Sequence, residues 1–244
     1  FSARLADRVA PWSTNFDLYE APVDGSAAPR NLTDDNEAWD TQPVFLANGD
    51  LAYLAMSRPG FEADRFEVRV RDARTGTTRA LTRDWDRSVS RLGTTTDRRR
   101  LLATADDVGQ LALFSIDPAN GRPTRLLGEG RVGEYSPAPG GAVVVAWDSL
   151  GAPPDLYVAT RAGVAPRRLT SINAGILDQR ALAAYEQFSF KGWNDETVYG
   201  YVMRPHGWQP GQRYPVAFLV HGGPQVSFQN QWNWRWNAQA FAGR

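Results

Sequence analysis

The chain has 244 residues, of which 42% are hydrophobic and 22% are charged, a composition typical of globular proteins. Its 27 basic and 27 acidic residues balance, which argues against a general affinity for nucleic acid. It contains no cysteine, so disulfides and thiolate metal sites are excluded, and no apolar run approaches the length needed to cross a membrane.

A repeat organises residues 1–170. Each copy has an apolar strand, a turn that contains glycine, and a short strand centred on a leucine. The four leucines recur at intervals of roughly 45 residues, at Leu32, Leu81, Leu126 and Leu169. Periods of about 40–50 residues with several short strands are typical of β-propeller blades, so we predict about four blades. An irregular β-sandwich is the alternative.

A second apolar strand is predicted before each copy. In three copies it covers residues 51–55, 101–105 and 142–147, whereas the first copy keeps only the remnant 9–12. Because a closed propeller generally needs more blades than these, we expect further blades upstream, and Phe1 suggests a cut or processed N-terminus. Location stays open among periplasm, exterior and cytoplasm, with a preference for the periplasm.

The pattern changes after Thr170. Residues 187–191 and 197–204 predict a hairpin, and the apolar run 214–220 predicts a buried strand. The recurrence of Trp232, Trp236 and Ala240 at every fourth position predicts a helix that ends near Gly243. We expect Trp232 and Trp236 to pack in the core; a specificity pocket walled by these two and Trp234 is the alternative.

The run 214–220 opens into His221-Gly222-Gly223-Pro224. In an α/β-hydrolase, a glycine turn after the third strand supplies a backbone N–H to the oxyanion hole. Gly223 is the candidate donor, because Pro224 has no N–H, and Gly222 is expected to permit the turn. A plain β-turn is the alternative reading.

The nucleophile elbow Gly-x-Ser-x-Gly, which follows that turn in α/β-hydrolases, occurs nowhere in the chain. We therefore predict a partial propeller at residues 1–183 and the start of an α/β-hydrolase domain at 184–244. The catalytic serine, acid and histidine are expected beyond residue 244, so the chain alone is predicted to be inactive. His221 is then expected to be structural, because the catalytic histidine follows the serine.

A propeller followed by a hairpin, a Tyr-Pro strand and His-Gly-Gly-Pro resembles the prolyl oligopeptidase family of serine peptidases, closest to its dipeptidyl-peptidase V and acylaminoacyl-peptidase branches. Residues 12–15, 39–43 and 58–65 favour the first branch. The resemblance implies release of dipeptides, or acylated residues, from peptide N-termini through an acyl-enzyme, without a cofactor. A non-catalytic propeller scaffold is the alternative, and the sequence after residue 244 would discriminate between them.

A dipeptidyl peptidase must recognise a free α-amine, which calls for a carboxylate. Glu62 and Asp64 lie in the polar loop 57–65 and are the candidates, with Glu62 preferred. A solvated carboxylate paired with Arg58 or Arg65, worth roughly 0–1 kcal/mol, is the alternative.

The remaining candidates receive structural interpretations. His206 is expected on a surface loop, and two histidines without a cysteine or carboxylate constellation predict no metal site. Residues 98–100 are expected to form a solvated turn, and the sequon Asn31-Leu32-Thr33 is read as part of a blade. The expected partners are peptide substrates, not nucleic acid or membrane, with a homo-oligomer left open for the full-length enzyme.

Overall fold

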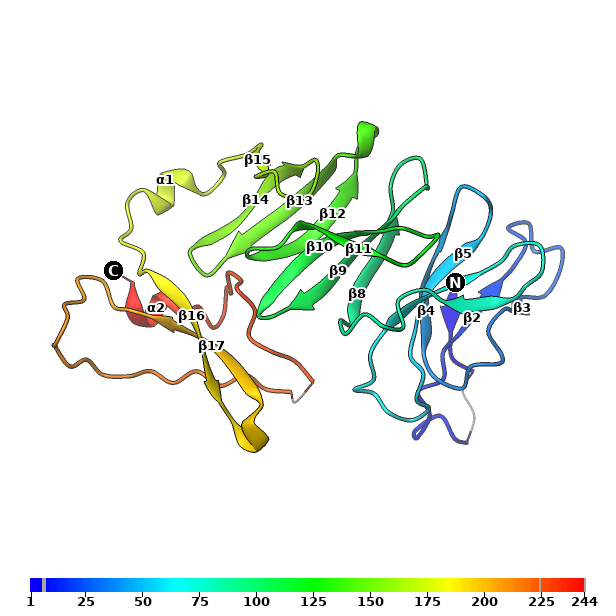
Figure 1. The fold of residues 1–244 in the computed structure, drawn as a ribbon, viewed down its shortest axis with the longest axis horizontal. Helices are drawn as coiled ribbons and strands as arrows, with labels where there is room; N and C mark the ends of the chain where they lie inside the picture. The colour runs from blue at the N-terminus through cyan, green and yellow to red at the C-terminus, as the bar shows by residue number, and fades with distance from the viewer. Residues whose placement is uncertain (6–7, 224, 244) are drawn as a thin grey trace. The chain divides into compact units, whose positions relative to one another are not determined.

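The computed structural model describes residues 1–5, 8–223 and 225–243 (Figure 1). The chain forms two compact units, which are treated separately below. Unit 1 contains residues 1–105 and 113–125, and unit 2 contains residues 106–112 and 126–244. No helix among the described residues is long and apolar enough to span a membrane.

Unit 1 is built mainly from antiparallel strands connected by turns and loops. The first sheet has the order β1 (Ser2–Ala3), β2 (Asp17–Glu20) and β3 (Arg30–Asn31). A four-stranded meander follows, with β4 (Asp40–Phe45), β5 (Leu51–Ala55), β6 (Glu67–Arg71) and β7 (Thr78–Ala80). The next four strands are β8 (Val89–Thr94), β9 (Leu101–Asp107), β10 (Gln110–Ile116) and β11 (Pro123–Leu127), and β9 and β10 run through both units.

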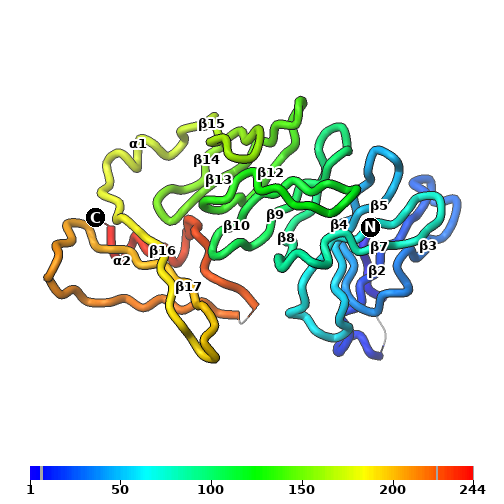
Figure 2. Tube along the Cα trace, viewed as in Figure 1, coloured from blue at the N-terminus to red at the C-terminus, as the bar shows by residue number. Residues whose placement is uncertain are grey.

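Unit 2 contains another antiparallel meander and a hairpin (Figure 2). The meander comprises β12 (Arg131–Pro137), β13 (Val143–Ser149), β14 (Ala152–Ala159) and β15 (Arg167–Arg168). After α1 (Ala174–Leu177), the hairpin pairs β16 (Tyr185–Lys191) with β17 (Thr197–Met203) in unbroken register. A short helix, α2 (Gln239–Ala242), lies close to the end of the chain, and 3-10 turns cover Pro139–Gly141 and Trp193–Asp195.

The successive meanders confirm the predicted all-β, propeller-type architecture. The predicted strands at 51–55, 101–105 and 142–147 correspond to β5, β9 and β13, and the hairpin after residue 184 is also confirmed. The prediction for residues 9–12 is wrong, because the described residues 8–12 form turns and Trp12 is 82% exposed. The strand that pairs with β2 is instead Ser2–Ala3, with Ser2 opposite Leu18.

The repeated leucine closes the outer edge of a blade. Leu81 donates its N–H to the Val68 carbonyl at 2.8 Å, and Thr82 Oγ1 accepts the Val68 N–H at 2.8 Å. The same pair of hydrogen bonds recurs between Leu32-Thr33 and Leu18, and between Leu169-Thr170 and Leu156. Each Leu-Thr phrase therefore satisfies both backbone groups of one residue on the neighbouring strand. Thr33 is 1% exposed, which supports the structural reading of the sequon.

Aliphatic side chains from successive strands form the main core of unit 1. Leu54, Val68, Val89 and Leu101 are fully buried and belong to a single cluster. Trp85 meets the Phe114 ring edge-on at 4.9 Å between ring centres. Burying a side chain of this kind contributes about 1.5–3 kcal/mol, so the blades are stabilised mainly by this packing.

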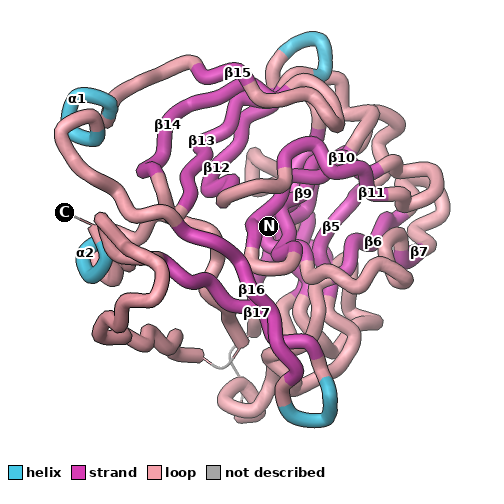
Figure 3. Tube along the Cα trace, turned by 60° about the vertical axis from the view of Figure 1, so that its left-hand side comes forward, coloured by secondary structure: helices cyan, strands magenta, loops and turns pink. Residues whose placement is uncertain are grey.

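The part of the chain after β17 differs from the sequence prediction. Residues 214–220 form no strand, and Figure 3 draws no strand after β17. Val216, Phe218 and Val220 are 87%, 86% and 72% exposed. A strand requires backbone pairing with a neighbour, and none of the described residues pairs with this run. The start of an α/β-hydrolase domain is therefore not confirmed.

The predicted helix from Trp232 forms only as α2 at its C-terminal end. Asn233 Oδ1 accepts the backbone N–H groups of Arg235 and Trp236, each at 2.8 Å, which holds this segment in a bend. Such local side-chain bonds compete with helical hydrogen bonding. The helix ends immediately before Gly243, as predicted.

Candidate functional site

The loop of residues 57–65, which carries Glu62 and Asp64, connects β5 to β6 in unit 1. The Gly60 N–H donates to Thr14 Oγ1 at 2.9 Å, so the loop lies against residues 12–15. The Arg58 guanidinium lies 4.1 Å from the centre of the Phe61 ring. Two of the three phrases that carry the family resemblance are therefore in contact.

Asp64 closes this loop. Its Oδ2 accepts the backbone N–H groups of Ser57 and Arg58, each at 2.8 Å, and its Oδ1 accepts Arg58 Nε at 3.0 Å. Burial acts to raise the pKa of Asp64, but these hydrogen bonds outweigh it and lower the pKa below its ordinary value of 3.8. Both carboxylate oxygens are thus engaged within the loop.

Glu62 is exposed and has no polar partner among the described residues. It does not form the predicted alternative pair with Arg58, because that guanidinium is bound to Asp64. Arg65 instead donates to the backbone carbonyls of Thr82 and Arg83. The two predicted carboxylates therefore have different environments, and of the two only Glu62 is available for an incoming cation.

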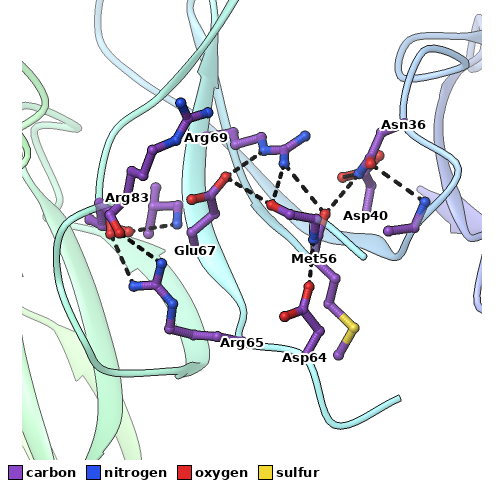
Figure 4. Close-up of polar contacts among 12 residues, drawn as sticks. Asn36, Asp40, Met56, Asp64, Arg65, Glu67, Arg69 and Arg83 are labelled. Atoms are coloured by element: carbon purple, nitrogen blue, oxygen red, sulfur yellow. Dashed lines mark hydrogen bonds and ion pairs between the residues drawn. The ribbon is translucent and has the colours of Figure 1, made fainter. Parts of the chain in front are cut away.

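A polar cluster not singled out by sequence reasoning lies where β4 begins, β5 ends and β6 begins (Figure 4). Arg69 forms an ion pair with Glu67 at 2.9 Å and donates to Ser57 Oγ at 2.9 Å. Asp40 is fully buried, with Oδ1 bonded to Asn36 Nδ2 at 2.9 Å and Oδ2 unpartnered among the described residues. Burial raises the pKa of Asp40 to about 7.

The turn predicted to supply an oxyanion donor lies in unit 2. Gly223 has a φ of +154°, and a Cβ built on it would lie 3.0 Å from Val226 Cγ2 and 3.1 Å from Gln225 N. This conformation strongly favours glycine. Gly222, in contrast, has no positive φ, and a Cβ there would meet nothing within 4 Å. The glycine requirement therefore falls on Gly223, while Pro224 lies outside the described residues.

Neither histidine of the chain lies in a metal site among the described residues. The His221 ring meets Phe228 edge-on, with 5.6 Å between ring centres, and His221 Nδ1 lies 2.8 Å from Gly222 O. His206 is exposed on a loop. No group of three or more histidine, cysteine or acidic side chains among the described residues is arranged to hold a metal.

A cavity of about 660 Å³ lies beside the turn in unit 2. The prediction that Trp236 packs in a core is wrong, because its side chain is 59% exposed and lines this cavity. Trp234 is 74% exposed and does not line it. The lining is mixed and includes Asp106, Phe218, Val220, His221, Val226 and Phe228.

Residues 98–100 form the turn between β8 and β9, where Arg98 has a φ of +57°. Arg100 is more than a solvated cation, because its Nε donates to Ser115 Oγ at 2.7 Å and its Nη1 lies 3.6 Å from Asp117 Oδ2. Sequence alone gave no signal for these partners, which lie at the end of β10 and immediately after it.

The comparisons with known proteins agree with this architecture. No protein-family model matches the chain. It is 29% identical over 227 residues to dipeptidyl-peptidase 5 of Aspergillus fumigatus, and 31% identical over 246 residues to a probable dipeptidyl-peptidase 5 of Aspergillus clavatus. These alignments cover 90% and 92% of the chain but only 31% and 33% of the relatives.

Among solved structures, the acylaminoacyl peptidase of Pyrococcus horikoshii matches with a TM-score of 0.74 at 16% identity. That match covers 93% of this chain and 33% of the peptidase, and it concerns the fold. The chain is therefore similar in sequence to one segment of proteins named dipeptidyl-peptidase 5, and similar in fold to part of an acylaminoacyl peptidase. It spans about a third of the length of the curated relatives that it matches.

Proposed function

We propose that the full-length protein is a serine peptidase that releases dipeptides, or acylated residues, from peptide N-termini. The observation that carries the proposal is the backbone of Gly223, held in a conformation that favours glycine immediately after His221-Gly222. Glycine can adopt this conformation, whereas a Cβ on residue 223 would lie 3.0 Å from Val226 Cγ2. The relatives named dipeptidyl-peptidase 5 support the same reaction class.

In this proposal, a serine outside this chain attacks the substrate carbonyl while a histidine takes its proton. The N–H of Gly223 donates to the oxygen that becomes negatively charged in the tetrahedral intermediate. Losing one such donor typically lowers the rate about 10²–10³-fold. We place the serine outside the chain because no Gly-x-Ser-x-Gly occurs within it.

We further propose that Glu62 binds the substrate α-amine and that Asp64 holds the loop in place. Glu62 is exposed and unpaired among the described residues, whereas Asp64 accepts three hydrogen bonds within the loop. A carboxylate whose acceptor sites are mostly occupied has little capacity left for an ammonium group. This division of roles accounts for two acidic residues in one short loop.

The test uses the full-length protein, chromogenic dipeptidyl and acyl-amino-acid substrates, and a fluorophosphonate probe. We expect turnover and covalent serine labelling, and we expect the purified 244-residue chain to show neither. Gly223→Val should lower kcat about 10²–10³-fold with a smaller effect on KM, because the donor acts on the developing oxyanion. Gly222→Ala is the matched control, since a Cβ at Gly222 meets nothing within 4 Å.

The melting temperatures and circular dichroism of the variants would separate a catalytic loss from a folding defect. A full-length protein without turnover or labelling would refute the peptidase proposal. A folded Gly223→Val protein with parental kcat would remove Gly223 from the mechanism while leaving the reaction class intact.

A further inference from the structure

We propose that Asn230 is a positioning residue that fixes the Gly223 turn by tying the segment after it to the connection between β9 and β10. The inference rests on the oxyanion role proposed for Gly223. All the contacts that carry it lie within unit 2.

Asn230 uses its main chain and both ends of its side chain in this attachment. Its backbone N–H donates to Gly109 O at 2.7 Å, and its Nδ2 donates to Gln110 Oε1 at 3.1 Å. Its Oδ1 accepts the Leu150 N–H at 2.9 Å. Asn230 is 6% exposed, so a lost partner would leave a buried polar group unsatisfied.

The connection between β9 and β10, to which Asn230 is bonded, is itself tightly constrained. Gly109 has a φ of +77°, and a Cβ on it would lie 2.8 Å from both Gln187 Nε2 and Tyr201 Oη. The Tyr201 hydroxyl donates to Gly109 O at 2.8 Å and lies 2.7 Å from Gln110 Nε2. Burial raises the pKa of Tyr201 to about 12, so the hydroxyl keeps its proton at neutral pH. The hairpin β16–β17 therefore supports the same connection that holds Asn230.

A second attachment follows two residues later. The Trp232 N–H donates to Asp148 Oδ1 at 2.7 Å, and Asp148 is 4% exposed. Gln229 Nε2 also donates to Asp106 Oδ1. Residues 229–232 are thus held by side chains and turns of the preceding strands.

The contacts then continue from this attachment to the glycine turn. Phe228, two residues before Asn230, packs edge-on against His221, and His221 Nδ1 lies 2.8 Å from Gly222 O. Val226 Cγ2 occupies the space beside Gly223 where a Cβ would point. A shift of residues 226–228 would therefore be transmitted to the turn.

The chemical consequence concerns the direction of one N–H group. A misplacement of about 1 Å at a reacting centre can lower the rate about 100-fold, even when its cause lies away from the chemistry. Asn230 touches no reacting atom in this proposal. Its effect on kcat would arise through the position of Gly223.

The experiment is a double-mutant cycle in the full-length protein. Asn230→Ala removes both side-chain hydrogen bonds, and Asn230→Asp keeps the acceptor for Leu150 N–H while losing the donor to Gln110. The control is Asn120→Ala, because among the described residues Asn120 Oδ1 accepts one local hydrogen bond, from the Arg122 N–H. We expect Asn230→Ala to lower kcat about 10–100-fold with KM within about threefold, and Asn230→Asp to have an intermediate effect. Asn120→Ala should leave both constants at parental values.

The decisive measurement introduces Asn230→Ala into the Gly223→Val protein. If Asn230 acts through the turn, Asn230→Ala should lower kcat less than about twofold there, because the N–H of residue 223 is already displaced. Losses that multiply in the double variant, or a parental kcat in folded Asn230→Ala, would overturn the proposal. In either case a strong effect of Gly223→Val alone would leave the proposed function intact. An unmodified full-length protein without turnover would instead contradict the proposed function itself.

Discussion

The Asp64 carboxylate lies 2.8 Å from the backbone nitrogen of Ser57, and this contact closes the loop 57–65 on itself. Arg58 adds a second backbone N–H and its guanidinium to the same carboxylate. Glu62, between the two ends of the loop, has no polar partner among the described residues. In this loop the Asp64 carboxylate therefore holds the backbone in place, and the Glu62 carboxylate is free.

Replacing Glu62 tests its proposed role in substrate binding. In the full-length protein, Glu62→Gln should raise KM for free-amine dipeptidyl substrates about 30-fold, because an ammonium group loses its ionic partner. KM for N-blocked substrates should stay at the parental value. Glu20→Gln is the matched control, since Glu20 is exposed and its one ionic partner within the described part of the chain is Arg30. Equal KM values for Glu62→Gln and parent on free-amine substrates would show that Glu62 does not bind the substrate amine.

Replacing Asp64 should act on the loop instead. Asp64→Asn weakens the three hydrogen bonds within residues 57–65, so we expect a lower melting temperature and raised KM for both substrate classes. Because the pKa of Asp64 is lowered in the folded state, its stabilisation is present above the unfolded pKa and is lost as pH falls through the folded pKa. The difference in melting temperature between parent and variant should therefore shrink below about pH 4. A selective loss of free-amine substrates would instead assign amine binding to Asp64.

Asp40 should give the opposite pH dependence. Its folded pKa of about 7 lies above the ordinary value of 3.8, so its contribution to stability is full below about pH 4 and is lost as pH rises through 7. The total change is roughly 4 kcal/mol. Asp40→Asn removes this titration and keeps an acceptor for Asn36. We expect the melting temperature of the variant to rise relative to the parent between pH 5 and pH 8, and a constant difference would contradict the raised pKa.

The Leu-Thr phrase predicts that the hydroxyl of Thr82 stabilises the folded protein. Thr82→Val keeps the side-chain volume but leaves the buried Val68 N–H without its acceptor, which should destabilise the protein by about 1–3 kcal/mol. Thr75→Val is the control, since Thr75 lies in an exposed turn. The melting temperatures of both variants provide the measurement. An unchanged melting temperature for Thr82→Val would show that the hydroxyl is dispensable at the blade edge.

The sequence by itself determined the blade architecture. The outer strands were recognisable because each is a short apolar run followed by a glycine turn and the same Leu-Thr or Leu-Leu phrase, and these signals are local. The strands β4, β8 and β12 were missed because their burial is irregular along the strand and Pro43 interrupts β4. Propensity and periodicity do not identify such strands, whose pairing is decided by the neighbouring strand.

Only the tertiary structure decided the roles of individual polar residues. The sequence offered both Glu62 and Asp64 as candidates, with Glu62 preferred, and the hydrogen bonds from Ser57 and Arg58 occupy Asp64 and leave Glu62 free. Asn230 and Gly109 are separated by more than a hundred residues, so no local pattern could predict that they meet. The run 214–220 shows the reverse case, because its apolar pattern predicts a strand whereas strand formation also needs a partner backbone. Hydrogen bonds between distant segments depend on where the fold brings their donors and acceptors, and that placement is a property of the packed chain.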